Sequence, residues 1–259
     1  MNILTLVILT FRDGESCLET IKSGLKITEA KFVVIDCNIE PDWRLREQLF
    51  NTVPESRFEY FMFGESSIPQ AMNFGLTKSK GHWVWFLNSG DVINDVDIHM
   101  LKRDLNSKVD LLIGDSKISN ELGLINDWKY PAMNSAKFSF GMNTYCHQAC
   151  IFNRNSLDLW NGFPLVDHFD WLTTFYFTTK LETKLISSFT IHYKSGGKSS
   201  NENLLSWALT NYKIRRKFRW LFHGNIYSDG VVYIFYIPLR MFLNMLDSRR
   251  QKNWWKVGN

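Results

Sequence analysis

The sequence predicts an α/β fold in which helices flank a mostly parallel central sheet. Short apolar runs rich in β-branched and aromatic residues alternate with segments of helical periodicity. Hydrophobic residues make up 45% of the 259 residues, which is enough to bury a large core. Several of the strand-like runs end in polar residues, and the carboxyl edge of such sheets is where ligands bind. These three observations direct the search for function to the strand ends.

The predicted elements follow one another in near-strict alternation, which favours right-handed crossovers between parallel strands. We expect strands at residues 3–10, 31–37, 57–63, 82–88, 109–118, 149–154 and 183–193. We expect helices at residues 16–27, 42–53, 68–79, 96–106 and 170–181. Ser16, with Glu19 three residues later, predicts a capping box at the first helix. Asp42 is expected to begin the second helix, and Pro69 lies near the start of the third.

The charge of the chain is unevenly distributed. The net charge is +4, yet residues 211–259 hold ten Lys and Arg against two acids, and residues 1–210 are mildly acidic. This asymmetry predicts a polyanionic partner for the tail. The four cysteines form no CxxC pair, which favours a reduced intracellular setting. The apolar start reads as a strand, because it lacks the basic segment and cleavage site of a signal peptide.

Polar groups close three predicted strands, at Thr10, at Asp36 and over 88–91, where the sequence is Asn-Ser-Gly-Asp. An ionised Asp36 accepts hydrogen bonds, so it suits a base N–H or a ribose hydroxyl, but it suits equally well the cap of the following turn. Asp91 is a candidate ligand for Mg²⁺ or Mn²⁺ on a nucleoside diphosphate. The alternative is a plain turn, which the spacing alone favours, because all four residue types are common in turns.

Five motifs, in sequence order, resemble the inverting family-2 glycosyltransferases of bacterial surface polysaccharides, especially the colanic-acid and O-antigen transferases. The first two are the helix and the strand within SIPQAMNFGLTKSKGHWVWFLNSGD, which ends at Asp91. The others are CHQACIF, HFDWLTTFYF and YKSGGKSS. The resemblance covers roughly residues 3–220 and implies the GT-A fold, with a glycosyltransferase domain at residues 1–202.

The resemblance also implies the residues of a donor site. Thr10 and Asp36 match positions that line the pocket for the nucleotide base, and Asn73 lies in the matching helix motif. Asn88 and Asp91 match the motif for the diphosphate and the metal, which implies a divalent cation, Mn²⁺ or Mg²⁺. Many relatives carry Asp where this chain has Asn88 and Gly90, so Asp91 is the only carboxylate of the motif. Gln70 and Ser67 also depart from the family pattern, and we expect these changes to affect donor selection.

The catalytic base implied by the resemblance is Asp170. Inversion at an anomeric carbon is a direct displacement, which needs a base for the acceptor hydroxyl on the face opposite the leaving group. From the residues alone, Asp170 is more simply the cap of its helix. The resemblance places His147, Gln148, His192, Gly196 and Gly197 on the acceptor side of the site. The plainer readings are a buried, satisfied histidine for His147 and a strand-end hydrogen bond for His192.

Residues 203–259 are predicted to form a helical, basic and aromatic segment. The apolar run 230–246 is short for a membrane span and is interrupted by Pro238 and Arg240. Peripheral association with an anionic membrane is favoured, because cations meet lipid head groups while Trp and Phe settle at the interface. A packed helix pair with a solvated basic face is the plain alternative. Nucleic acid is the least favoured partner, because no recognition module is present.

These observations and the resemblance together predict a cytoplasmic, peripherally membrane-bound inverting glycosyltransferase. It moves a hexose or N-acetylhexosamine from a nucleotide sugar, expected to be UDP-linked, to a glycan on a polyprenyl diphosphate. The alternative is a scaffold protein that binds nucleotide sugars but is catalytically weakened. This alternative stays open because Asp91 is the only carboxylate of the aspartate motif. A different nucleotide-binding α/β enzyme is disfavoured, because neither GxGxxG nor GxxxxGK[ST] follows the first predicted strand.

Overall fold

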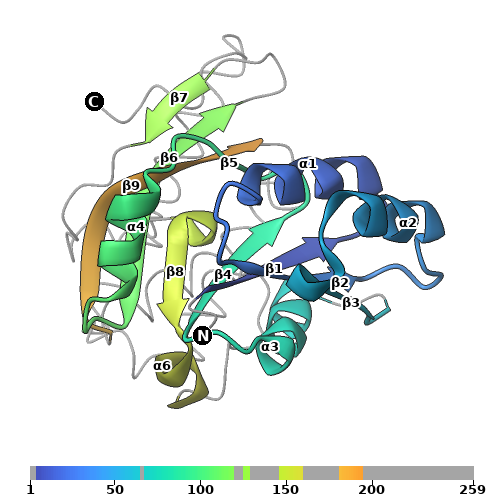
Figure 1. The fold of residues 1–259 in the computed structure, drawn as a ribbon, viewed down its shortest axis with the longest axis horizontal. Coiled ribbons are helices and arrows are strands. Elements are labelled where there is room, and N and C mark those ends of the chain that lie inside the picture. Colours follow the sequence, from blue (N-terminus) through green and yellow to red (C-terminus); the bar gives the residue numbers. More distant parts are fainter. Residues whose placement is uncertain (1–3, 65–66, 120–124, 129–145, 160–180, 195–259) are drawn as a thin grey trace, which may run out of the picture. The chain divides into compact units, whose positions relative to one another are not determined.

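The computed structural model describes residues 4–64, 67–119, 125–128, 146–159 and 181–194 (Figure 1). The chain divides into two compact units, and all of these residues belong to the first, which comprises residues 1–130 and 145–195. The predictions for Asp170, Gly196, Gly197 and the basic tail fall outside the described residues, as does the predicted boundary after residue 202. They stay predictions.

Nine strands form one sheet in the described part of the chain. They are β1 (Leu4–Thr10), β2 (Lys31–Asp36), β3 (Phe58–Met62), β4 (Trp83–Asn88), β5 (Val92–Ile93), β6 (Leu111–Ser119), β7 (Ile125–Trp128), β8 (Cys150–Asn153) and β9 (Thr183–Lys194). The order across the sheet is β3-β2-β1-β4-β8-β6-β9-β5, and β7 pairs with β6. From β3 to β4 all neighbours are parallel, whereas β8 runs antiparallel to both β4 and β6. The sheet is therefore parallel in its first half and mixed beyond it.

Helices cover both faces of the parallel half, with α1 and α2 on one face and α3 on the other (Figure 1). The helices are α1 (Gly14–Gly24), α2 (Trp43–Thr52), α3 (Ile68–Lys78), α4 (Ile98–Leu105) and α6 (Arg154–Leu159). Alternate residues of a strand point to opposite faces. Leu6 and Ile8 of β1 accordingly join the core beneath α1 and α2, while Val7 joins the core beneath α3. Burial on both faces explains why the predicted strands are continuous apolar runs.

The start of α1 corrects one sequence-based prediction. The N-cap is Asp13, not Ser16, and its carboxylate accepts the Ser16 N–H (3.3 Å). Both residue types are good caps, but Asp13 places its acceptor where Gly14 already turns into the helix. The other predicted cap is confirmed, because the Asp42 carboxylate accepts the Leu45 N–H (2.9 Å) at the start of α2.

Helix α3 approaches β1 closely because residue 75 is glycine. A Cβ atom on Gly75 would lie 2.3 Å from Cγ1 of Val7, well inside van der Waals contact. The glycine therefore sets the separation between this helix and the sheet. Because α3 follows β3 and runs back along the sheet, its first turn lies at the carboxyl edge of the strands.

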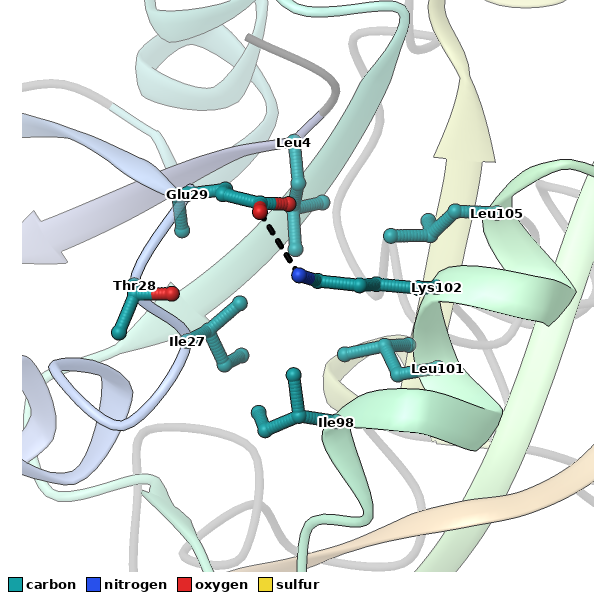
Figure 2. A pocket seen from close by; sticks show the side chains of 9 residues that line it. Leu4, Ile27, Thr28, Glu29, Ile98, Leu101, Lys102 and Leu105 are labelled. Carbon is teal, nitrogen blue, oxygen red and sulfur yellow. Dashed lines mark hydrogen bonds and ion pairs between the residues drawn. The ribbon is translucent and has the colours of Figure 1, made fainter.

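A small pocket lies where α4 meets the segment leading into β2 (Figure 2). Ile98, Leu101 and Leu105 of α4 line it on one side, and Leu4 and Ile27 line it on the other. An ion pair between Lys102 Nζ and Glu29 Oε1 (2.7 Å) lies beside it, and both side chains are about half exposed. Leu4 begins β1, so this pocket lies at the amino edge of the sheet, away from the polar strand ends.

Candidate nucleotide-sugar site

The polar ends of β1, β2 and β4 lie side by side at the carboxyl edge of the sheet. Thr10 is the register partner of Asp36, and Asn88 is the partner of Leu9. The ladder continues one step past the strands, since the Thr10 carbonyl accepts the Cys37 N–H (2.9 Å) and the Leu9 carbonyl accepts the Ser89 N–H (2.9 Å). The juxtaposition expected from parallel pairing is present.

The carboxylate of Asp36 is fully buried and holds the loop that follows it. Oδ1 accepts the Asn38 N–H (2.9 Å) and Oδ2 accepts the Asp42 N–H (3.1 Å). The hydroxyl of Tyr60, on the neighbouring strand β3, also donates to Oδ2. Asp36 therefore caps the turn that follows it, as one of its two interpretations predicted. Its predicted contact with a nucleotide base stays a prediction.

Tyr60 is a partner that the sequence reading missed. Burial, and then its hydrogen bond to Asp36, raise the pKa of the Tyr60 hydroxyl above its ordinary value. The phenol is therefore a proton donor at all physiological pH values and keeps Asp36 as the acceptor. The apolar and aromatic run at residues 57–63 predicted a strand that includes Tyr60, but only the pairing of β3 with β2 brings its hydroxyl to Asp36.

The segment 88–91 forms a tight turn directly after β4. The Asn88 carbonyl accepts the Asp91 N–H (3.1 Å), and Gly90 has φ +89°, a conformation that favours glycine. The Asp91 side chain is 4% exposed, and its Oδ2 accepts the Asn88 N–H (2.6 Å). The turn therefore aims the Asp91 carboxylate back at the end of β4, at the same edge of the sheet as the ends of β1 and β2.

The residues present suit a cation that arrives with a phosphate better than a resident metal. Within the described ranges, no group of three or more His, Cys, Asp and Glu side chains is arranged to hold a metal ion. Magnesium and manganese sites for nucleotides need only one or two carboxylates, because phosphate oxygens and water complete the shell. The single carboxylate of Asp91 at the strand ends meets that requirement.

Three acceptor-side candidates lie within the described residues, and strand pairing places one of them, His192, next to this turn. His192 on β9 is the register partner of Val92, the residue that follows Asp91. His147 and Gln148 form a short 3-10 turn before β8, and both are buried. The indole N–H of Trp85 on β4 donates to the Gln148 carbonyl (2.6 Å), which holds this turn against β4. Sequence order alone did not predict these positions.

The two residues that follow β1, Phe11 and Arg12, add an exposed aromatic ring and a cation to the same edge. Phe11 is 48% exposed, and the Arg12 guanidinium lies 4.8 Å from its ring centroid. Arg12 has φ 55°, which is uncommon for a residue other than glycine, and its N–H donates to Asn38 Oδ1 (2.9 Å). The loops after β1 and β2 are thus tied together. A left-handed arginine has no signal in a single sequence, so this tie was not predicted.

Cys17 lies beneath the strand ends, and its thiol is unreactive. It is fully buried on α1, and burial raises the pKa of its thiol to about 12. The thiolate is the reactive form of cysteine, so Cys17 is a packing group rather than a nucleophile.

The remaining donor-side candidates lie on α3. Asn73 is half-buried in the second turn of this helix. Ser67 and Gln70, which depart from the family pattern, cap the helix: Gln70 Oε1 accepts the Ser67 N–H (2.9 Å). The presence of Ser67 and Gln70 in place of the usual family residues is thus compatible with a well-formed helix start at the carboxyl edge.

Comparison with known proteins identifies the class of fold. No protein-family profile and no curated protein sequence matches this chain. Among solved structures, residues 1–349 of TarS from S. aureus in complex with UDP-GlcNAc match with a TM-score of 0.59 and 18% identity. That match covers 82% of this chain and 66% of TarS 1–349.

A second solved structure has the same fold. The mannosyltransferase PcManGT from Pyrobaculum calidifontis, in complex with GDP-Man and Mn²⁺, matches with a TM-score of 0.58 and 12% identity, over 90% of this chain and 70% of that one. TarS 1–349 solved with UDP matches over 82% of this chain, which spans 65% of its length, less than two thirds. The chain therefore has the GT-A-like fold of glycosyltransferases, and the predicted fold class is confirmed.

Proposed function

We propose that the chain is an inverting glycosyltransferase that moves a hexose or N-acetylhexosamine from a UDP-sugar to a lipid-linked glycan. The observation that carries the proposal is the meeting of Thr10, Asp36, Asn88 and Asp91 at one sheet edge. It is supported by the fold, because solved proteins of this fold hold UDP-GlcNAc, UDP or GDP-Man.

The proposed reaction is a single displacement. An acceptor hydroxyl attacks the anomeric carbon, the bond from that carbon to the diphosphate oxygen breaks, and the nucleoside diphosphate leaves with the electron pair. Asp170 receives the hydroxyl proton on the opposite face, as a general base. The loops after β1 and β2 hold the nucleoside, and the turn 88–91 holds the diphosphate end. Asp91 would hold a divalent cation, which would supply charge stabilisation for the departing diphosphate.

The proposed acceptor is a glycan on a polyprenyl diphosphate at the cytoplasmic face of a membrane. The basic and aromatic composition of residues 203–259 supports this, since such segments bind anionic lipid surfaces. In the described residues, no helix has the length and hydropathy needed to cross a membrane.

We expect UDP-sugars with Mn²⁺ to raise the melting temperature of the protein more than GDP- or dTDP-sugars. A ligand that binds only the folded state stabilises it by mass action, so a donor at a hundredfold excess over Kd raises Tm by about 5–10 °C. The measurement is a thermal-shift series over a donor panel, followed by mass spectrometry for transfer or donor hydrolysis. If no nucleotide sugar shifts Tm, the donor site is wrong. If a donor binds without any turnover, the chain is the catalytically weakened scaffold instead.

We expect Asp91→Asn to weaken Mn²⁺-dependent UDP binding. Asparagine keeps an oxygen for the Asn88 N–H but loses the charge that attracts the cation. Calorimetric titration of UDP with and without Mn²⁺ should show a loss of about 10–100-fold in the Mn²⁺ arm, the range for disturbing a metal shell. The matched control is Asp95→Asn, an exposed carboxylate four residues further on. Unchanged Mn²⁺-dependent binding in Asp91→Asn would remove the metal role of this residue.

A further inference from the structure

Two buried hydroxyl groups of α1 bond to the chain just after β4, Thr20 at the turn 88–91 and Ser23 at Ile93 of β5. Thr20 is fully buried and Ser23 is 8% exposed. Thr20 Oγ1 accepts the Gly90 N–H (2.9 Å) and lies 3.2 Å from the Asn88 carbonyl and 3.1 Å from that of Ser16. Ser23 Oγ accepts the Ile93 N–H (3.0 Å) and donates to the Thr20 carbonyl (2.7 Å).

The spacing of these residues explains why both reach the same segment. Positions three apart lie on one face of a helix, and this face of α1 meets the chain just after β4. The Thr20 hydroxyl accepts the Gly90 N–H and lies within hydrogen-bond distance of the Asn88 carbonyl, so it contacts the backbone on both sides of Ser89. The Gly90 N–H also donates to the Ser16 carbonyl (3.2 Å), so two residues of α1 that are four positions apart, Ser16 and Thr20, both contact the segment 88–91.

The segment 88–91 has two hydrogen bonds of its own, between Asn88 and Asp91, and Ser89 is tied to Leu9 of β1, so the contacts from α1 act mainly at Gly90. Gly90 has the greatest backbone freedom of any residue, and it is held at φ +89°. A metal-binding carboxylate works only when it is held within about 0.5 Å of its productive place. If the turn were loose, binding of a cation and a diphosphate would have to supply the cost of ordering it.

We propose that Thr20 is a positioning residue for the diphosphate and cation end of the donor site. Its hydroxyl fixes the turn from α1, so that Asp91 is already in place when a nucleoside diphosphate and its cation arrive. This inference rests on the proposed function, because it assigns the same turn to the donor.

The chain contains a matched control for the chemical change. Thr5 is also buried, and its Oγ1 accepts a glycine N–H, that of Gly81 (3.1 Å). Thr5 lies near the start of β1, at the opposite edge of the sheet from the turn. Thr20→Val and Thr5→Val therefore remove the same group and the same kind of hydrogen bond, and only one of them lies at the proposed site.

The test is calorimetric titration of UDP with Mn²⁺ into wild type, Thr20→Val, Thr20→Ser and Thr5→Val, with urea unfolding of each. We expect Thr20→Val to bind about tenfold or more weakly, as when the partner of a metal ligand is lost. Thr20→Ser keeps the hydroxyl and should bind within about twofold of wild type, as should Thr5→Val. Amide hydrogen exchange at Gly90 should accelerate in Thr20→Val alone, whether or not ligand is present.

The outcomes separate this inference from the proposed function. If wild type binds no UDP in the presence of Mn²⁺, the proposed function fails. If wild type binds and Thr20→Val binds as well as Thr5→Val does, only the role of Thr20 is overturned. Should Thr20→Val be too unstable to purify, the pair Thr20→Ala and Thr5→Ala is expected to show the same difference, and equal affinities in that pair would overturn the role.

Discussion

Replacing Asp170 by asparagine should lower the rate of sugar transfer by about 10²–10⁴-fold, the usual contribution of a general base. The amide is nearly the same size as the carboxylate but does not accept the proton of the acceptor hydroxyl. Donor binding should stay within about twofold of wild type, because the base acts on the acceptor. The measurement is the initial rate of transfer at saturating donor, with UDP binding measured alongside.

The matched control is Asp167→Asn, which makes the same change three residues earlier, just before the motif HFDWLTTFYF. It should retain most of the wild-type rate. A near wild-type rate in Asp170→Asn would show that the base is elsewhere, and loss of turnover in Asp167→Asn alone would move the assignment to that residue.

Replacing Trp85 by alanine should lower the free energy of unfolding by about 3–5 kcal/mol, the usual cost of deleting a buried aromatic side chain. Trp85 is fully buried on β4 and lies 4.3 Å from the ring centroid of Phe189 on β9. Its loss opens a cavity between two strands and leaves the Gln148 carbonyl without the indole donor. Urea unfolding followed by circular dichroism measures the change.

Two further variants distinguish the contribution of the buried ring from that of the indole hydrogen bond and from the effect of removing any Trp side chain. Trp85→Phe keeps most of the ring contact but lacks the indole N–H, so it should cost less than alanine and act mainly on the turn at His147 and Gln148. Trp43→Ala removes the same side chain where it is 62% exposed on α2, and we expect a change of about 0.5 kcal/mol or less. Equal unfolding midpoints for Trp85→Ala and Trp43→Ala would contradict the packing described for β4.

Most strands and helices were predictable because their signals are local. The apolar runs of β1, β2 and β4 and the Asp42 cap of α2 depend on residues within one element. Local reading was wrong at the start of α1, where Asp13 and Ser16 are both good caps and only the path of the chain decides between them. It also missed β5, β7 and α6, because β5 has only two residues and the polar residues of β7 and α6 form neither an apolar run nor a helical period.

The sequence by its own pattern determined that polar groups would follow β1, β2 and β4, and parallel pairing then required these groups to share an edge. Only the tertiary structure decided what each of them touches. The Asp36 carboxylate accepts a hydrogen bond from Tyr60, 24 residues away in the sequence. Thr20 contacts the turn of Asp91 at Gly90, 70 residues away, and His192 pairs with Val92 beside that turn, 100 residues away. Such contacts depend on strand order and helix placement, which arise from packing the whole core and leave no periodic trace in the residues that make them.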